Sequence, residues 1–209
     1  MILEPHVVGP LQVNCFIVGC ESSKEALVID PGDEGERILA RIAALGLQLK
    51  TIINTHGHFD HIGGNRLLME KSGAELLIHS ADAELLPKAK EHGRKYGLDV
   101  RVSPPPTRLL HGGETLSVGT LKIQVIATPG HTPGGISLLI ADHLFSGDTL
   151  FADSVGRTDL PGGDHDTLVA SIRQRLFILP ETTFVHPGHG PDTTIGREKR
   201  LNPYVGAGA

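Results

Sequence analysis

A histidine-rich segment at residues 55–64, Thr-His-Gly-His-Phe-Asp-His-Ile-Gly-Gly, concentrates groups that can bind metal ions. Four candidate ligands fall within six residues, namely His56, His58, Asp60 and His61. His56 and His58 are two residues apart and can point to one side of an extended segment, whereas a turn would aim Asp60 and His61 at a different point. Neutral imidazole is the commonest metal ligand in proteins. The spacing therefore predicts two neighbouring metal positions rather than one.

Three further polar residues, His131, Asp148 and His189, repeat the same local setting. Each lies in a turn rich in glycine or proline that directly follows a predicted strand. Loops at strand ends are where a rigid sheet presents functional groups. Any one of these residues alone would be an ordinary loop residue, but together with residues 56–61 they predict one shared site for metal-dependent chemistry.

Short strands and helices alternate along the chain and must position these turns. Apolar residues at helical spacing predict helices at residues 38–45 and 167–177. Further helices are predicted at residues 66–72, 81–96 with a break at Pro87, and 197–201. Runs of apolar and β-branched residues predict strands at residues 11–18, 26–30, 50–54, 76–79, 115–118, 121–127, 136–140, 143–145 and 183–185. This alternation predicts one mixed α/β domain over residues 1–209.

Composition and charge narrow the class of protein. The chain has 209 residues, 39% of them hydrophobic and 21% charged, and a net charge of -5 without any basic block. We therefore expect no nucleic acid as the main partner. No apolar run exceeds four residues, so no membrane span is expected. The first residues lack the pattern of a signal peptide, which favours a cytoplasmic location.

The two cysteines, Cys15 and Cys20, are predicted to be reduced and buried. Five residues apart in an extended strand, they would lie on the order of 17 Å from each other, too far for a disulfide bond. Unpaired thiols agree with a cytoplasmic protein.

The complete pattern resembles the metallo-β-lactamase superfamily. The resemblance implies an αββα sandwich of two mixed sheets flanked by helices, with the metals at one edge of the sheets. It implies two divalent metal ions, the first with three histidines, the second with one aspartate and two histidines, and an aspartate that bridges both. By this resemblance, His56, His58 and His131 would hold the first ion, and Asp60, His61 and His189 the second. Asp148 would bridge both ions.

Residues 147–163 and 187–194 are most similar to the short, single-domain, bacterial glyoxalase II-like group of hydroxyacylglutathione hydrolases. This implies a thioesterase that acts on S-(2-hydroxyacyl)glutathione or a related small-molecule thioester, with Asp60 orienting the attacking water and accepting its proton. Zinc is the expected metal, with iron or manganese as alternatives. Full-length glyoxalase II adds a C-terminal helical domain that binds glutathione, whereas this chain ends twenty residues after His189, so the thiol half stays open.

Arg157 is the predicted substrate-binding residue, because its planar guanidinium could hold a carboxylate. The alternative for this residue is an ion pair with Asp159 or Asp153.

Other reactions also remain open. A persulfide dioxygenase of this fold would use one iron on His56, His131 and Asp148, but Val155 stands where that group carries a cysteine. The same dinuclear centre could also hydrolyse lactones or phosphoesters. The sequence leaves the oligomeric state open.

Overall fold

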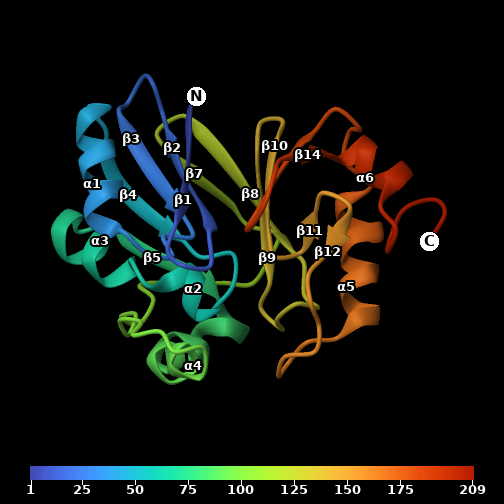
Figure 1. The fold of residues 1–209 in the computed structure, drawn as a ribbon. Coiled ribbons are helices and arrows are strands. Elements are labelled where there is room, and N and C mark those ends of the chain that lie inside the picture. Colours follow the sequence, from blue (N-terminus) through green and yellow to red (C-terminus); the bar gives the residue numbers. More distant parts are fainter.

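The computed structural model describes residues 1–209 and contains two mixed six-stranded sheets, which pack face to face between layers of helices (Figure 1). The first sheet follows the chain in order and consists of β1 (Ile2–Val8), β2 (Val13–Gly19), β3 (Glu25–Ile29), β4 (Gln48–Ile53), β5 (Glu75–His79) and β6 (Arg108–Leu110). Its first three strands are antiparallel, and β3 to β6 are parallel.

The second sheet has the order β14-β13-β10-β9-β8-β7. Only β10 and β13 are parallel neighbours in it. The strands are β7 (Thr115–Val118), β8 (Leu121–Ala127), β9 (Ile136–Ile140), β10 (His143–Gly147), β13 (Phe184–Pro187) and β14 (Thr193–Thr194). A separate two-stranded ribbon pairs β11 (Leu150–Phe151) with β12 (Ser154–Val155).

Helices cover the outer face of each sheet. On α1 the buried Ile38 and Ile42 are four residues apart and face the sheet, which is the spacing of one helix face. The second sheet carries α5, which begins where the Asp164 side chain accepts a hydrogen bond from the Thr167 amide at 2.7 Å. The helices are α1 (Gly35–Ala44), α2 (Phe59–Ile62), α3 (Asn65–Ser72), the 3-10 helix η1 (Ser80–Lys88), α4 (Ala89–Lys95), α5 (His165–Ser171), the π-helical turn η2 (Ile172–Leu176) and α6 (Ile195–Leu201).

Three apolar clusters hold the four layers together. A cluster of 19 buried residues lies between the first sheet and its helices, and one of 9 lies between the second sheet and α5 and α6. The 15 residues of the remaining cluster fill the space between the sheets, where the rings of Phe16 and Phe145 meet edge to face at 5.0 Å. No helix has the length and the apolar content to cross a membrane.

This architecture confirms the predicted αββα sandwich of two mixed sheets. Strands β7, β8 and β9 have the predicted bounds. The strand predicted at residues 11–18 begins only at Val13, because Gln12 has a φ of 55° and lies in a turn. Strand β1 escaped prediction because Glu4, Pro5 and His6 interrupt its apolar character, a composition typical of an edge strand.

Candidate metal centre

The predicted ligands converge at one edge of the two sheets. Strands β10 and β13 are parallel and pair Gly147 with Pro187, so the residues that follow them, Asp148 and His189, lie at the same edge. Residues 54–61 follow β4 of the first sheet, and His131 lies in the connection from β8 to β9 of the second. The site therefore draws side chains from both sheets.

Two separate groups of three side chains have mutually close ligand atoms, all within 4.8 Å inside each group, and a third such set, Asp30 with His56 and His61, overlaps both. Asp148 lies between the groups: its Oδ1 is 3.5 Å from the Nε2 of His61, and its Oδ2 is 3.6 Å and 3.7 Å from the Nε2 atoms of His131 and His189. This arrangement agrees with the division that the resemblance implied. The groups are His56, His58 and His131, and Asp60, His61 and His189.

Hydrogen bonds to the far ring nitrogens orient the histidines. His131 Nδ1 donates to the Arg157 carbonyl at 2.7 Å, and His189 Nδ1 donates to the Leu11 carbonyl at 3.0 Å. Each bond leaves Nε2 as the free ligand atom. His58 uses the other nitrogen, because its Nδ1 lies 2.9 Å from the Nε2 of His131 and the two atoms face the same point.

Buried polar atoms without partners test whether metal ions fit this site. His56 Nε2, His61 Nε2 and Asp148 Oδ1 are all buried and none has a hydrogen-bond partner. An unsatisfied buried polar group is costly, so such atoms call for a partner that a metal ion can supply. One unsatisfied atom from each ligand group and one from the carboxylate between them fit a centre with two metal ions.

The carboxylates of the candidate centre also favour the binding of cations. Burial alone would lower the pKa of His61, but the carboxylates of Asp148, Asp60 and Asp30 raise it to about 10. Burial lowers the pKa of His56 well below its usual value, and the neighbouring histidines lower it further. Burial would raise the pKa of Asp60, yet His61 and His189 hold it well below its usual value. Asp60 is therefore ionised at neutral pH and can attract a metal cation.

A family comparison agrees with this geometry. The model of the metallo-β-lactamase superfamily matches residues 8–189, which include all seven predicted ligands. The chain belongs to the metallo-β-lactamase superfamily.

Relatives and solved structures of this superfamily match nearly the whole chain. Hydroxyacylglutathione hydrolase GloC of Haemophilus influenzae is 37% identical, over 98% of both chains. The crystal structure of BLEG-1 B3 metallo-β-lactamase gives a TM-score of 0.91 at 37% identity, and covers 98% of this chain and 99% of its own. The crystal structure of TTHA1623 in a di-iron-bound form gives a TM-score of 0.89 at 42% identity, and covers 96% of this chain and 99% of its own. These matches support a metal-dependent hydrolase, and their names differ in substrate and metal.

Asp30 contacts the candidate ligands and could not be predicted from the sequence. It lies just after β3 with a φ of 50°, and its Oδ1 accepts a hydrogen bond from the Thr55 amide at 2.7 Å. Its Oδ2 accepts from Thr55 Oγ1 at 2.6 Å and from His61 Nδ1 at 3.0 Å. Thr55 Oγ1 in turn accepts from His56 Nδ1 at 3.1 Å. One carboxylate therefore fixes the ring orientation of a histidine in each ligand group.

We expect Asp30→Asn to weaken metal binding by about 10- to 100-fold, the range for groups that orient metal ligands. An amide offers only one acceptor oxygen, so it cannot serve the Thr55 amide, the Thr55 hydroxyl and His61 together. Competition with a chromophoric chelator measures the affinity. The control is Asp33→Asn, because Asp33 lies three residues further along the chain and its side chain is exposed. Equal metal affinities for both variants would contradict the role of Asp30.

Two further features keep the superfamily's ligand loops in place. A Cβ on Gly188 would overlap Asp148 Oδ1 and would lie 2.8 Å from His61 Cε1, so only glycine fits beside the ligands. The buried Asp82 accepts hydrogen bonds from the Gly57 amide at 2.9 Å and from the Gly134 amide at 2.7 Å. It thereby connects the loop of His56 and His58 with the loop of His131. No local motif marks Asp82 in the sequence.

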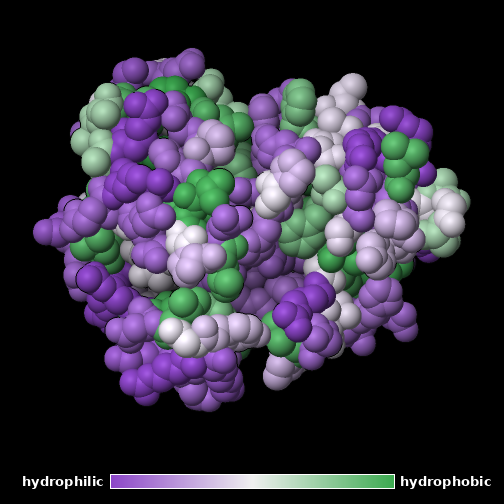
Figure 2. All heavy atoms as spheres, viewed as in Figure 1, coloured by the Kyte–Doolittle hydropathy of each residue, from purple (hydrophilic) through white to green (hydrophobic).

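A cleft of about 550 Å³ opens above the ligands. In Figure 2 a hollow with hydrophilic walls separates the half that carries α1 to α4 from the half that carries α5 and α6. Arg157 lines this cleft and binds Asp159 through two hydrogen bonds of 2.7 Å. Asp153, the other partner considered for Arg157, instead binds Arg197 at 2.8 Å.

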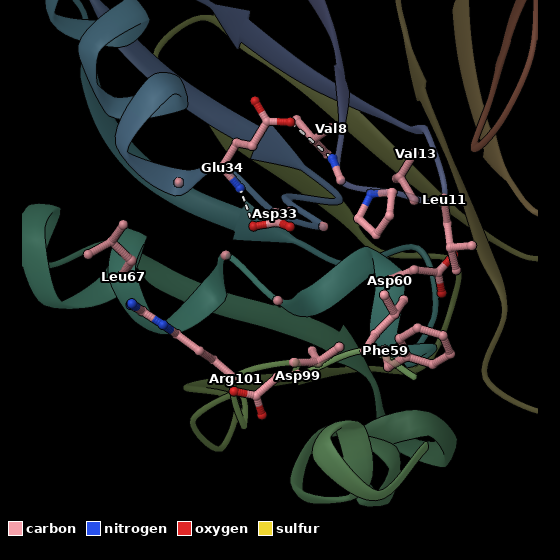
Figure 3. Close-up of a pocket in the computed structure, with 18 of the residues that line it drawn as sticks. Val8, Leu11, Val13, Asp33, Glu34, Phe59, Asp60, Leu67, Asp99 and Arg101 are labelled. Carbon is pink, nitrogen blue, oxygen red and sulfur yellow. Dashed lines mark hydrogen bonds between the residues drawn. The ribbon is translucent and has the colours of Figure 1, made fainter. Parts of the chain in front are cut away.

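A second cavity of about 330 Å³ lies on the other side of Asp60, and the two cavities share Asp60, Phe59 and Leu11. Figure 3 shows Asp33 and Glu34 on one side of it, across from Arg101. Its charged lining is mainly acidic, with Asp33, Glu34, Glu36 and Asp99 against Arg101. The two cavities at the candidate centre therefore differ in charge.

Proposed function

We propose that this chain is a dinuclear metal-dependent thioesterase that acts on S-(2-hydroxyacyl)glutathione or a related small-molecule thioester. The observation that carries the proposal is the position of Asp148 between two complete three-residue ligand groups. Zinc is the expected metal in both groups. The likeness to hydroxyacylglutathione hydrolase GloC supports the choice of a glutathione thioester.

Two bound divalent ions would lower the pKa of water towards neutrality and polarise the substrate carbonyl. Asp60 supplies the remaining proton chemistry. Its Oδ2 lies 3.5 Å from His189 Nε2 and 3.7 Å from His61 Nε2. The ionised carboxylate can orient the attacking water and accept its proton. The leaving thiolate has an ordinary pKa of about 8.5, so it departs without a dedicated general acid.

We also propose a cytoplasmic location, with neither nucleic acid nor a membrane as a partner. Both cysteines are free and buried, which supports a reducing compartment. The net charge of -5 supports a partner other than nucleic acid.

Thiol release from S-D-lactoylglutathione tests the proposed reaction, with the bound metal quantified on the same sample. We expect turnover with about two metal ions per chain, because the site has two ligand groups. Dialysis against a chelator should abolish turnover, and added zinc should restore it. Turnover that persists without metal would overturn the proposal. So would a single bound iron together with oxygen uptake on glutathione persulfide, the result that a dioxygenase would give.

A further inference from the structure

One wall of the cleft above the candidate metal centre carries a row of basic side chains. Lys88 ends η1, and His92 and Lys95 lie on α4, so the three residues have the spacing i, i+4 and i+7. Residues at this spacing share one face of a helix. All three line the cleft. We call Lys88, His92 and Lys95 the basic row.

Packing fixes α4 beside the metal ligands. Ala89 and Gly93 are buried, and a Cβ on Gly93 would lie 2.6 Å from Val100, so the helix sits tightly against the segment that follows it. Tyr96 packs on Phe59, with ring centroids 5.3 Å apart, and Phe59 directly precedes Asp60. The basic row is therefore held over the same cleft as the reacting groups.

The charge of this row is largely uncompensated. Lys88 and His92 form no ion pair with a carboxylate, and Lys95 meets only Glu91, at 3.6 Å, with both of these side chains exposed. The carboxylates that line the cleft are Asp60 and Asp148, both candidate metal ligands. Arg157, in contrast, already binds Asp159 through two hydrogen bonds. Lys88 thus offers positive charge that no protein carboxylate neutralises, and the charge of Lys95 meets only the exposed Glu91.

We infer that the basic row binds the carboxylates of the thiol half of the substrate, and so selects thioesters of anionic thiols. This inference rests on the proposed thioesterase function. The apolar lining from Leu85, Phe151 and Leu160 leaves the rest of the substrate in a less polar environment. The acidic cavity of Figure 3 would repel the same carboxylates, which directs an anionic thiol to the cleft.

A pair of substrates with the same acyl group tests the inference on the metal-loaded protein. S-D-lactoylglutathione carries carboxylates on its thiol half, whereas S-D-lactoyl-N-acetylcysteamine is neutral there. In Lys88→Gln/Lys95→Gln we expect kcat/KM for the glutathione thioester to fall by about 10-fold through KM, because two charged contacts are lost. The neutral thioester should react at the wild-type rate.

The control is Lys71→Gln/Lys90→Gln, which changes the net charge equally at exposed lysines outside the cleft. It should react with both thioesters like the wild type. Equal losses on both substrates in the cleft variant, or an equal loss in the control, would overturn the inference. Thermal unfolding confirms that both variants are folded.

Binding separates the two proposals if the wild type hydrolyses neither thioester, a result that would overturn the thioesterase function alone. S-hexylglutathione, a thioether that cannot be hydrolysed, then serves as the probe in isothermal titration calorimetry. Weaker binding by about 10-fold in the cleft variant only would support the basic row. Equal binding by both variants, or no binding by the wild type, would overturn it.

Discussion

Asp148→Asn should abolish activity and leave fewer than two tightly bound metal ions per chain. The carboxylate of Asp148 approaches His61 with one oxygen and His131 and His189 with the other, so it touches both ligand groups. An amide has one acceptor oxygen and no charge, and it cannot bridge two cations. A metal centre supplies several kcal/mol of transition-state stabilisation, so we expect kcat/KM to fall by more than about 1,000-fold.

The matched control is Asp142→Asn. Asp142 and Asp148 flank the two ends of β10, but Asp142 is exposed and faces only His143, at 3.5 Å. Its variant should keep two metal ions and wild-type turnover. Elemental analysis of the purified proteins gives the metal content, and thiol release gives kcat/KM. An Asp148→Asn protein with two tightly bound ions would show that this residue does not bridge the groups.

Asp60→Asn is expected to lower kcat by about 100- to 10,000-fold at saturating metal, the contribution typical of a group that accepts a proton in the reaction. Asp60 stays ionised at neutral pH, because His61 and His189 hold its pKa well below the usual value. Asparagine retains the shape of the side chain but cannot accept a proton. The His56 group keeps its three histidines and Asp148 in this variant.

Asp99→Asn is the control for Asp60. Both residues line the cavity of Figure 3, but Asp99 is 89% exposed and meets only Lys90, at 3.8 Å. Metal content and kcat are measured on the same samples at increasing zinc concentration. Turnover that stays intact in Asp60→Asn with both metals bound would show that Asp60 takes no part in the proton transfer.

The candidate ligands could be predicted because their signals are local. His56, His58, Asp60 and His61 lie within one segment, and His131, Asp148 and His189 each follow a recognisable strand. The alternation of short strands and helices predicted a mixed α/β domain, and the family resemblance carried by these motifs implied the αββα architecture that the structure shows.

Residues that act through long-range contacts could not be found in this way. Asp30 holds Thr55 and His61 across 25 and 31 residues, and Asp82 reaches Gly134 across 52. Each of these carboxylates shows its role only when the loops are folded against it. The tautomers of the histidines also depend on such contacts, including the carbonyl of Leu11, which accepts from His189.

The distribution of the ligands between the two sheets determines when each ligand group becomes complete during synthesis of the chain. The first sheet ends at Leu110, and by then synthesis has provided His56, His58, Asp60 and His61. Each ligand group still lacks a member, since His131 and His189 belong to the second sheet's loops. A nascent chain, which folds from its N-terminal part onward, can therefore complete neither group before its second half emerges from the ribosome. Metal ions held by these two groups would then bind late in biosynthesis and would connect the two halves of the chain.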